Sequence, residues 1–196
     1  MTSAQDAAER IHPDSLVEWS RWLEQNHERP AGVWLVSWKK STGRQAFGYE
    51  DAVVEALRFG WIDSKGGKVD DERTMLWFAP RRKSSAWSRS NKERIARLER
   101  EGRLEAAGRR SVEAAKANGT WTLLDDVEDL VVPEDLAAAL DALPGARGSW
   151  DAFLPSARRQ SLYWIAEAKR PETRSRRVEE TARLAAKGER IDQRRP

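Results

Sequence analysis

Apolar residues in the first sixty positions follow two different periods. From Pro13 to Asn26 they recur every three or four residues, which is the pattern of a helix with one buried side. From Gly32 to Lys39 both alternating sets are largely apolar, as expected for a central strand that is covered on both faces. Helical spacing returns from Tyr49 to Phe59, and Gly60 stands where a glycine commonly ends a helix.

The next stretch predicts a β-hairpin. Trp61–Lys65 and Lys68–Ala79 have the composition of two antiparallel strands, and the pair Gly66-Gly67 between them suits the positive φ angles of a tight turn. Pro80 then ends the second strand. The first half of the chain is therefore predicted to form a small antiparallel sheet of about three strands, with helices packed on it.

Beyond this hairpin the pattern is helical. Ser88 or Ser90 is suited to start the next helix, because Ser90 and Glu93 have the spacing of a capping box. The later helices expected are Leu104–Asn118, Glu134–Leu143, Ser156–Arg170 and Thr173–Ala186. The helix that starts at Ser88 or Ser90 is expected to end near Arg100, before Gly102.

Two segments of the second half lack helical spacing. Trp121–Val132 is acidic and apolar and is expected to be an extended connector, and Gly145–Pro155 is expected to be a loop with a short turn at Trp150–Leu154. The fold class predicted is α+β, with a sheet-containing first domain at 1–118 and an all-helical segment at 119–196. We expect the two to pack together as one compact unit.

The composition excludes several classes of protein and site. No run of about 18 apolar residues is present, so no membrane insertion is expected, and the N-terminus lacks the apolar core of a signal peptide. The absence of cysteine excludes disulfides, thiolate catalysis and cysteine-bound metal. The histidines, His12 and His27, have no ligand-like spacing, so no metal and no cofactor are expected. We therefore expect a cytoplasmic protein.

The charges are unevenly distributed, although the net charge is only +3. Arg81–Arg110 contains eleven Lys or Arg against four Asp or Glu, whereas 120–153 contains eight acidic residues against Arg147 alone. One interpretation is an ordinary surface of alternating basic and acidic segments. The other is a basic face that attracts phosphate groups or an acidic partner.

The junction between the hairpin and the serine-rich helix is the first candidate site. A helix start presents unpaired N–H groups and a partial positive charge, and here cations and hydroxyl groups precede it. Together these groups have the chemistry of an anion site, in which the indole of Trp87 would stack on a planar group or anchor the loop. The residues of this predicted anion site are Arg73, Arg81, Arg82, Lys83, Trp87, Ser88, Ser90 and Asn91. The alternative is that the serines cap the helix and the arginines are simply exposed.

The carboxylates of the hairpin form the second candidate site. Carboxylates that a hairpin brings together bind hard cations or transfer protons, whereas interleaved Lys and Arg favour cross-strand ion pairs. The predicted pocket is lined by Trp61, Asp63, Lys65 and Asp70, with Asp63 or Asp70 as the acid or base of an enzyme.

The arginine-rich helices at the C-terminus are the third candidate. Arginines along a helix track a phosphate backbone, which would make this segment a nucleic-acid interface. Glutamates are interspersed three or four residues from several of the arginines, so an ion-paired surface is the competing interpretation.

Three stretches carry a resemblance to a known family. They are FGWIDS at 59–64 with the later DDER, FAPR and SAWS steps, the segment WLEQNHERPAGVWLVSWKKSTG at 22–43, and WIAEAKRPETRSRRVEETARLAAKG at 164–188. In this combination the chain resembles the YdeI/OmpD-associated, bacteriocin-protection family. The resemblance implies a role in bacteriocin protection or an association with a porin, and it supplies no catalytic residues.

Three functions follow from these observations as hypotheses. The first is a non-enzymatic stress or defence accessory protein that binds a small anion or an acidic protein partner at the first candidate site. The second is an enzyme that uses a carboxylate of the hairpin. The third is a nucleic-acid binder that uses the C-terminal helices.

Overall fold

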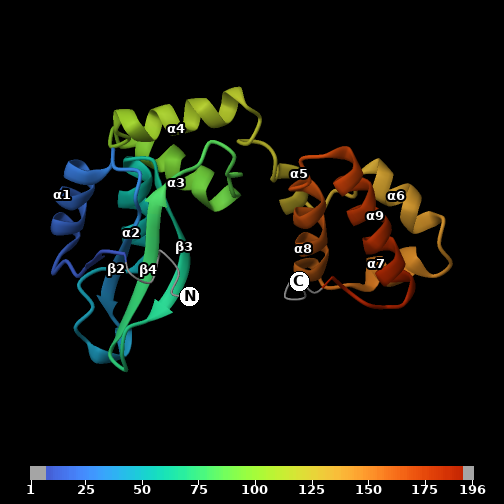
Figure 1. Cartoon of the computed structure of the whole chain (residues 1–196), viewed down its shortest axis with the longest axis horizontal. Coiled ribbons are helices and arrows are strands. Elements are labelled where there is room, and N and C mark those ends of the chain that lie inside the picture. The colour runs from blue at the N-terminus through green and yellow to red at the C-terminus, as the bar shows by residue number, and fades with distance from the viewer. Residues whose placement is uncertain (1–7, 192–196) are drawn as a thin grey trace. The chain divides into compact units, whose positions relative to one another are not determined.

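The computed structural model describes residues 8–191 and divides the chain into two units. The first unit consists of the residues up to Ser85 together with Ser90–Trp121. The second consists of Ala86–Arg89 together with the residues from Thr122 onward (Figure 1). No helix in the described part of the chain has the length and apolarity needed to cross a membrane.

The first unit is built on a mixed sheet with the strand order β1-β2-β4-β3. The strands are β1 (Arg10–Ile11), β2 (Val33–Trp38), β3 (Trp61–Lys68) and β4 (Arg73–Pro80). The three longer strands pair antiparallel, as predicted, and β1 adds a short parallel edge beside β2. Together with the helical C-terminal half, this sheet confirms the predicted α+β fold.

The hairpin turn predicted at Gly66-Gly67 is wrong. Both glycines lie within β3, next to a register shift between Asp63 and Gly66, and the turn is made by the four residues 69–72. There the carboxylate of Asp70 accepts the backbone N–H groups of Glu72 and Arg73 at 3.0 and 2.7 Å. This side-chain-to-backbone pattern stabilises a turn without any need for glycine.

One face of the sheet is covered by two helices, α1 (Leu16–Asn26) and α2 (Tyr49–Arg58) (Figure 1). The indole of Trp19 on α1 lies 5.2 Å from the ring of Phe78 on β4, and its Nε1 donates to the carbonyl of Ala52 at 3.1 Å. A buried tryptophan whose N–H is satisfied in this way ties both helices to one strand. The apolar spacing of Pro13–Asn26 and Tyr49–Phe59 thus predicted the two core helices correctly.

Two further helices complete the first unit: α3 (Arg89–Arg100), apart from its first residue, and α4 (Ala106–Ala117). The start of α4 lies against the end of α2 so closely that a Cβ atom added at Gly108 would come within 2.3 Å of the Arg58 carbonyl oxygen. Glycine at this position therefore sets the distance between the two helices.

A buried ion pair network links α2 to the segment between α3 and α4. Glu55 is 3% exposed, and its carboxylate accepts from Arg58 Nη1 at 2.6 Å and from Arg103 Nη2. Arg58 continues the network to Glu105 at 3.0 Å and to the carbonyl of Arg103 at 3.1 Å. A carboxylate this deeply buried is tolerated because two guanidinium groups compensate its charge.

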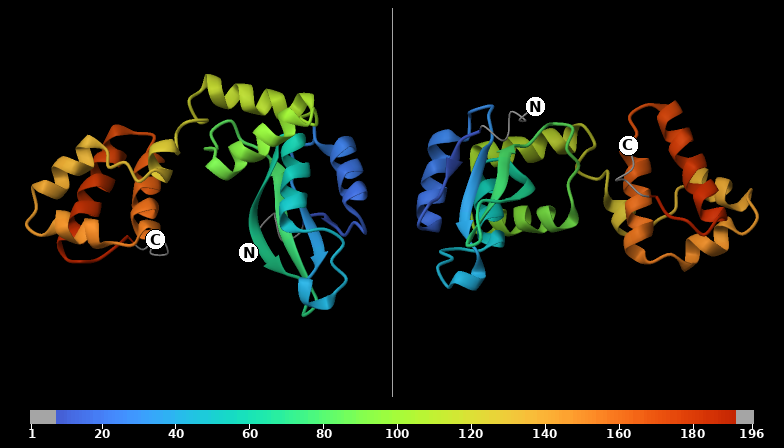
Figure 2. Two further views of the ribbon diagram at one scale, coloured as in Figure 1. Left: turned by 180° about the vertical axis from the view of Figure 1, so that it is seen from behind. Right: turned by 60° about the horizontal axis from the view of Figure 1, so that its bottom comes forward.

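Among the residues that the structure describes, the regular elements of the second unit are all helices, as predicted for the C-terminal half. Its helices are α5 (Asp125–Glu128), α6 (Glu134–Asp141), α7 (Ala146–Ala152), α8 (Pro155–Ala166) and α9 (Pro171–Ala186) (Figure 2). They pack around a core that includes Leu136, Leu140, Trp150, Ile165 and Val178. The connector expected to be extended contains the short helix α5, and the loop expected at 145–155 contains α7. Gly145 adopts a φ of 77° and initiates α7, so the glycine marks a helix boundary rather than a loop.

Substitution of Glu55 by Ala is expected to lower the free energy of unfolding by about 3 kcal/mol, since it removes the buried carboxylate that Arg58 and Arg103 share and leaves Arg58 only the exposed partner Glu105. Urea unfolding followed by tryptophan fluorescence measures this change. Glu180→Ala is the control, because the pair between Glu180 and Arg183 is exposed and its loss should leave the free energy close to that of the parent. Equal effects of the two substitutions would contradict the structural role of Glu55.

The same substitution at two helical glycines is expected to act in opposite directions. Gly108→Ala should destabilise the chain by about 2 kcal/mol, because the added methyl group meets the Leu57 and Arg58 carbonyls. Gly148→Ala in α7 should stabilise by about 0.5–1 kcal/mol, because nothing lies within 4 Å of the new Cβ and alanine favours a helix. Thermal unfolding of both variants followed by circular dichroism tests the pair. A stabilised Gly108→Ala protein would mean that α2 and α4 are not in close contact.

Candidate functional site

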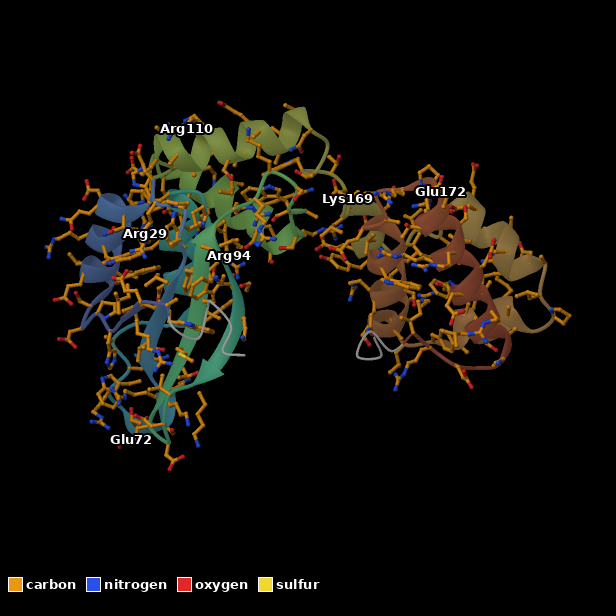
Figure 3. All side chains as sticks on the ribbon, in the orientation of Figure 1. Arg29, Glu72, Arg94, Arg110, Lys169 and Glu172 are labelled. Carbon is orange, nitrogen blue, oxygen red and sulfur yellow. The ribbon has the colours of Figure 1, made fainter. Side chains whose placement is uncertain are left out.

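Strand β4 separates two residues of the predicted anion site. Arg73 begins the strand at the hairpin end, where it pairs with Asp70 at 2.7 Å, whereas Arg81 follows its last residue. Arg73 and Arg81 are eight positions apart, which corresponds to roughly 26 Å of strand at about 3.3 Å per residue. Figure 3 places Glu72, the neighbour of Arg73, at the hairpin tip and Arg94 toward the other end of the sheet. The structure therefore does not bring Arg73 to the remaining cations.

Arg81 is a half-buried cation at the exit of the sheet. Its backbone N–H donates to the Gly60 carbonyl at 2.9 Å, and its Nη2 lies 3.4 Å from the Ser85 carbonyl oxygen. Burial lowers the pKa of Arg81 to about 10, against the opposing effect of the Asp63 charge. The side chain consequently stays positive at neutral pH while it is poorly hydrated.

Asp63 is the hairpin carboxylate that differs from the others. Three of them are ion-paired: Asp70 with Arg73, Asp71 with Lys68, and Glu72 with Arg44. Within residues 8–191 the carboxylate of Asp63 forms no ion pair within 4 Å, and it accepts the hydroxyl of Tyr49 at 3.0 Å. Partial burial, followed by the Asp63 charge, raises the pKa of Tyr49, so the phenol remains a hydrogen-bond donor.

Arg94 on α3 completes this group. Its guanidinium donates to Glu50 at 2.5 Å and to Asn91 Oδ1 at 2.7 Å. Arg97 adds a second, longer contact to Glu50 at 3.3 Å. We refer to Tyr49, Glu50, Asp63, Arg81, Asn91 and Arg94 as the Asp63 cluster; the strands and helices that supply them are β3, α2 and α3, with the segment after β4.

The sequence indicated half of the Asp63 cluster. Asp63, Arg81 and Asn91 were among the predicted site residues. Tyr49 and Glu50 were not, because they belong to the first turn of a helix, where aromatic and acidic residues are ordinary. The position of Arg94 three residues after Asn91 was the only signal that could have added it, since residues at this spacing share a helix face.

The start of α3, where the sequence predicts an anion site, already binds a carboxylate of the protein itself. The backbone N–H of Arg89, the first residue of α3, donates to both carboxylate oxygens of Glu128 at 3.0 and 2.9 Å. The Arg89 side chain pairs with Asp129 at 2.6 Å. Trp87 is buried. Like Arg89 and Glu128, Trp87 and Ser88 belong to the second unit, whereas Ser90 belongs to the first.

The other predicted residues have mixed environments. Arg82 and Lys83 are exposed, and the carbonyl of Lys83 accepts the amide of Asn118 at 2.8 Å. Trp61 is fully buried and donates to the His27 carbonyl at 2.9 Å, which makes it a core residue. The ammonium of Lys65 lies 5.8 Å from the Trp34 ring.

The arginines of the C-terminal helices are partly paired. Arg174 contacts Asp135 at 2.7 Å, and Arg183 contacts Glu180 at 2.6 Å. Arg177 donates to the Trp164 carbonyl and lies over its ring at 5.1 Å. These contacts fit the ion-paired surface better than a continuous phosphate-binding track.

No group of three or more His, Asp or Glu side chains within residues 8–191 is arranged to hold a metal ion. The Asp63 cluster combines the carboxylates of Asp63 and Glu50, the phenol of Tyr49, the amide of Asn91 and the guanidinium groups of Arg81 and Arg94. Its chemistry is that of recognition by charge-assisted hydrogen bonds.

Comparisons with known proteins give two family matches that meet near the boundary between the two units. The family described as "Bacteriocin-protection, YdeI or OmpD-Associated" matches residues 129–188, which confirms the resemblance for this part of the chain. The family described as "Domain of unknown function (DUF8412)" matches residues 11–111, just over half of the 196 residues. No curated protein and no solved structure matches the chain. By the match that includes the sheet and the Asp63 cluster, the chain belongs to the DUF8412 family.

Proposed function

We propose that the first unit binds a small anion at the Asp63 cluster, and that the chain acts as a binding protein rather than an enzyme. The observation that carries this proposal is Arg81, a half-buried guanidinium that remains charged although burial lowers its pKa to about 10. A poorly hydrated cation gains more from an anionic partner than an exposed one does, because less water has to be displaced. The exposed side chains of Arg82 and Lys83 follow directly and would attract the anion.

The acidic members of the cluster limit the affinity of such a site. Asp63 acts on Arg81 through its charge, and Glu50 occupies the guanidinium of Arg94 at 2.5 Å. An incoming anion competes with both carboxylates. We therefore expect binding in the micromolar to millimolar range, of about −4 to −8 kcal/mol. Such a site fits a regulatory or accessory role, and the bacteriocin-protection name of the C-terminal match is compatible with one.

A second candidate function is acid–base catalysis by Asp63. It is favoured by one observation, the absence of an ion pair to this carboxylate within the described part of the chain. Tyr49, whose pKa is raised, would then donate a hydrogen bond to a substrate oxygen. This candidate requires turnover of some substrate that Asp63→Asn abolishes in a protein that remains folded.

The anion proposal predicts opposite effects for two substitutions, measured by isothermal titration calorimetry at low ionic strength with inorganic phosphate and with a nucleoside monophosphate. Arg81→Gln should weaken binding about tenfold or more, because it removes the charge while retaining most of the side-chain length. Asp63→Asn should strengthen binding, because it removes a competing negative charge and keeps an acceptor for the Tyr49 hydroxyl.

Arg73→Gln is the matched control, since Arg73 lies at the far end of the same strand and pairs with Asp70. It should leave the affinity unchanged. The proposal is overturned if the parent binds neither probe, or if Arg73→Gln weakens binding as much as Arg81→Gln does. A weaker complex with Asp63→Asn would instead favour a direct role of that carboxylate.

A further inference from the structure

The first unit contains a cavity that none of the predicted sites includes. It has a volume of about 240 Å³ and lies between the helix-facing side of the sheet and the segment that leads into α2. Leu35 on β2 and Leu76 on β4 form its floor, and they are directly paired across the two strands. Phe47, in the segment before α2, and Tyr49, the first residue of α2, also line the cavity.

Small side chains explain why the space is hollow. The next cross-strand pair on the same face of β2 and β4 is Ser37 with Thr74, and Ala52, three residues after Tyr49 in α2, also lines the cavity. Helix α2 begins only at Tyr49, so this part of the sheet is covered by a loop rather than a helix. Gly66 lines the cavity opposite Leu76, and a Cβ atom added there would meet nothing within 4 Å.

The polar groups that line the cavity are uncharged. The Thr74 hydroxyl donates to the Gly67 carbonyl at 2.9 Å, which leaves its oxygen able to accept. Within residues 8–191 the Ser37 hydroxyl and the Gln45 amide form no side-chain hydrogen bond to the protein. The hydroxyl of Tyr49 already donates to Asp63, so Tyr49 contributes its apolar ring to the cavity lining. Tyr49 is 54% exposed, which leaves the cavity open to solvent beside it.

We propose that this cavity is a second binding site, for a small uncharged molecule with an apolar body and one group that both donates and accepts hydrogen bonds. A charged group would lose its hydration without meeting an ion of opposite charge, because no lining side chain carries a formal charge at neutral pH. An uncharged polar group would instead meet Ser37 and Gln45. A cavity of roughly 150 Å³ admits benzene, so about 240 Å³ admits one ring with a short substituent. This site does not depend on the anion proposal.

Three probes of one size and different charge test the proposal: 4-methylbenzamide, 4-methylbenzoate and 4-methylbenzylammonium. The full chain is labelled with ¹⁵N, and each probe is titrated while the amide signals of Gly48 and Gly66, which line the cavity, are followed. 4-Methylbenzamide should shift both glycine signals in a saturable manner. Its affinity should be at least tenfold higher than that of 4-methylbenzoate or of 4-methylbenzylammonium. Equal or tighter binding of an ion at these glycines would overturn the ligand class.

Gly66→Val is the decisive variant. Gly66 is paired with Leu76, which lines the cavity, and a Cβ atom added at Gly66 meets nothing within 4 Å, so we expect the valine side chain to fill part of the cavity. Because valine also favours a strand, the variant should be folded and should lose binding of 4-methylbenzamide at least tenfold. Gln45→Ala, at an exposed position, should weaken binding about three- to tenfold by removing one hydrogen-bonding group. Arg81→Gln should leave it unchanged, which separates this site from the anion site. The inference fails if the parent binds none of the probes, or if Gly66→Val still binds the amide like the parent.

Discussion

The carboxylate of Glu55 is the constraint on which the first unit depends. It is buried in the middle of α2 and receives two guanidinium groups, one from its own helix and one from the segment that follows α3. A buried charge of this kind has few alternative arrangements, because moving either arginine would remove one of its two guanidinium partners. The network therefore fixes α2 both along its axis and relative to α3. The close approach of α4 at Gly108 holds the end of the same helix.

The fixed position of α2 determines what lies at its start. Tyr49, the first residue of the helix, has the Asp63 carboxylate at its hydroxyl and the apolar cavity at its ring. Glu50, the next residue, holds Arg94 of α3. The first turn of α2 thus contacts both the charged Asp63 cluster and the uncharged cavity. The two proposed sites differ in chemistry because the polar and apolar sides of Tyr49 face in different directions.

The sequence predicted the elements whose signal is local. The helices near Pro13–Asn26 and Tyr49–Phe59 and the strand in Gly32–Lys39 have clear apolar periods. The hairpin turn could not be located, because Gly66-Gly67 and Asp70-Asp71 both suit turns and only the strand register decides between them. In α7 the glycines and prolines around the helix concealed the spacing of Ala146 and Trp150, which are four residues apart and both buried.

The candidate site was harder to predict than the fold. The consecutive cations Arg81, Arg82 and Lys83 marked one part of it. The bond between Tyr49 and Asp63 joins residues 14 positions apart, and it depends on the register shift that follows Asp63 in β3. Similarly, Glu128 reaches the backbone of Arg89 from 39 positions away. Contacts of this type follow from tertiary packing, so no local pattern indicates them.

The path of the chain between its two units has a consequence for how the protein can be divided. The chain enters the second unit at Ala86, returns at Ser90 and leaves the first unit again after Trp121. Ala86 packs against the core of the helical unit. The 32 residues of the first unit from Ser90 to Trp121 separate Ala86–Arg89 from the rest of the second unit, which begins at Thr122. A fragment that stops at Trp121 would keep a short piece of its neighbour's interior, and one that starts at Thr122 would lack it. The two family matches are consecutive in the sequence, yet no single cut yields both units intact.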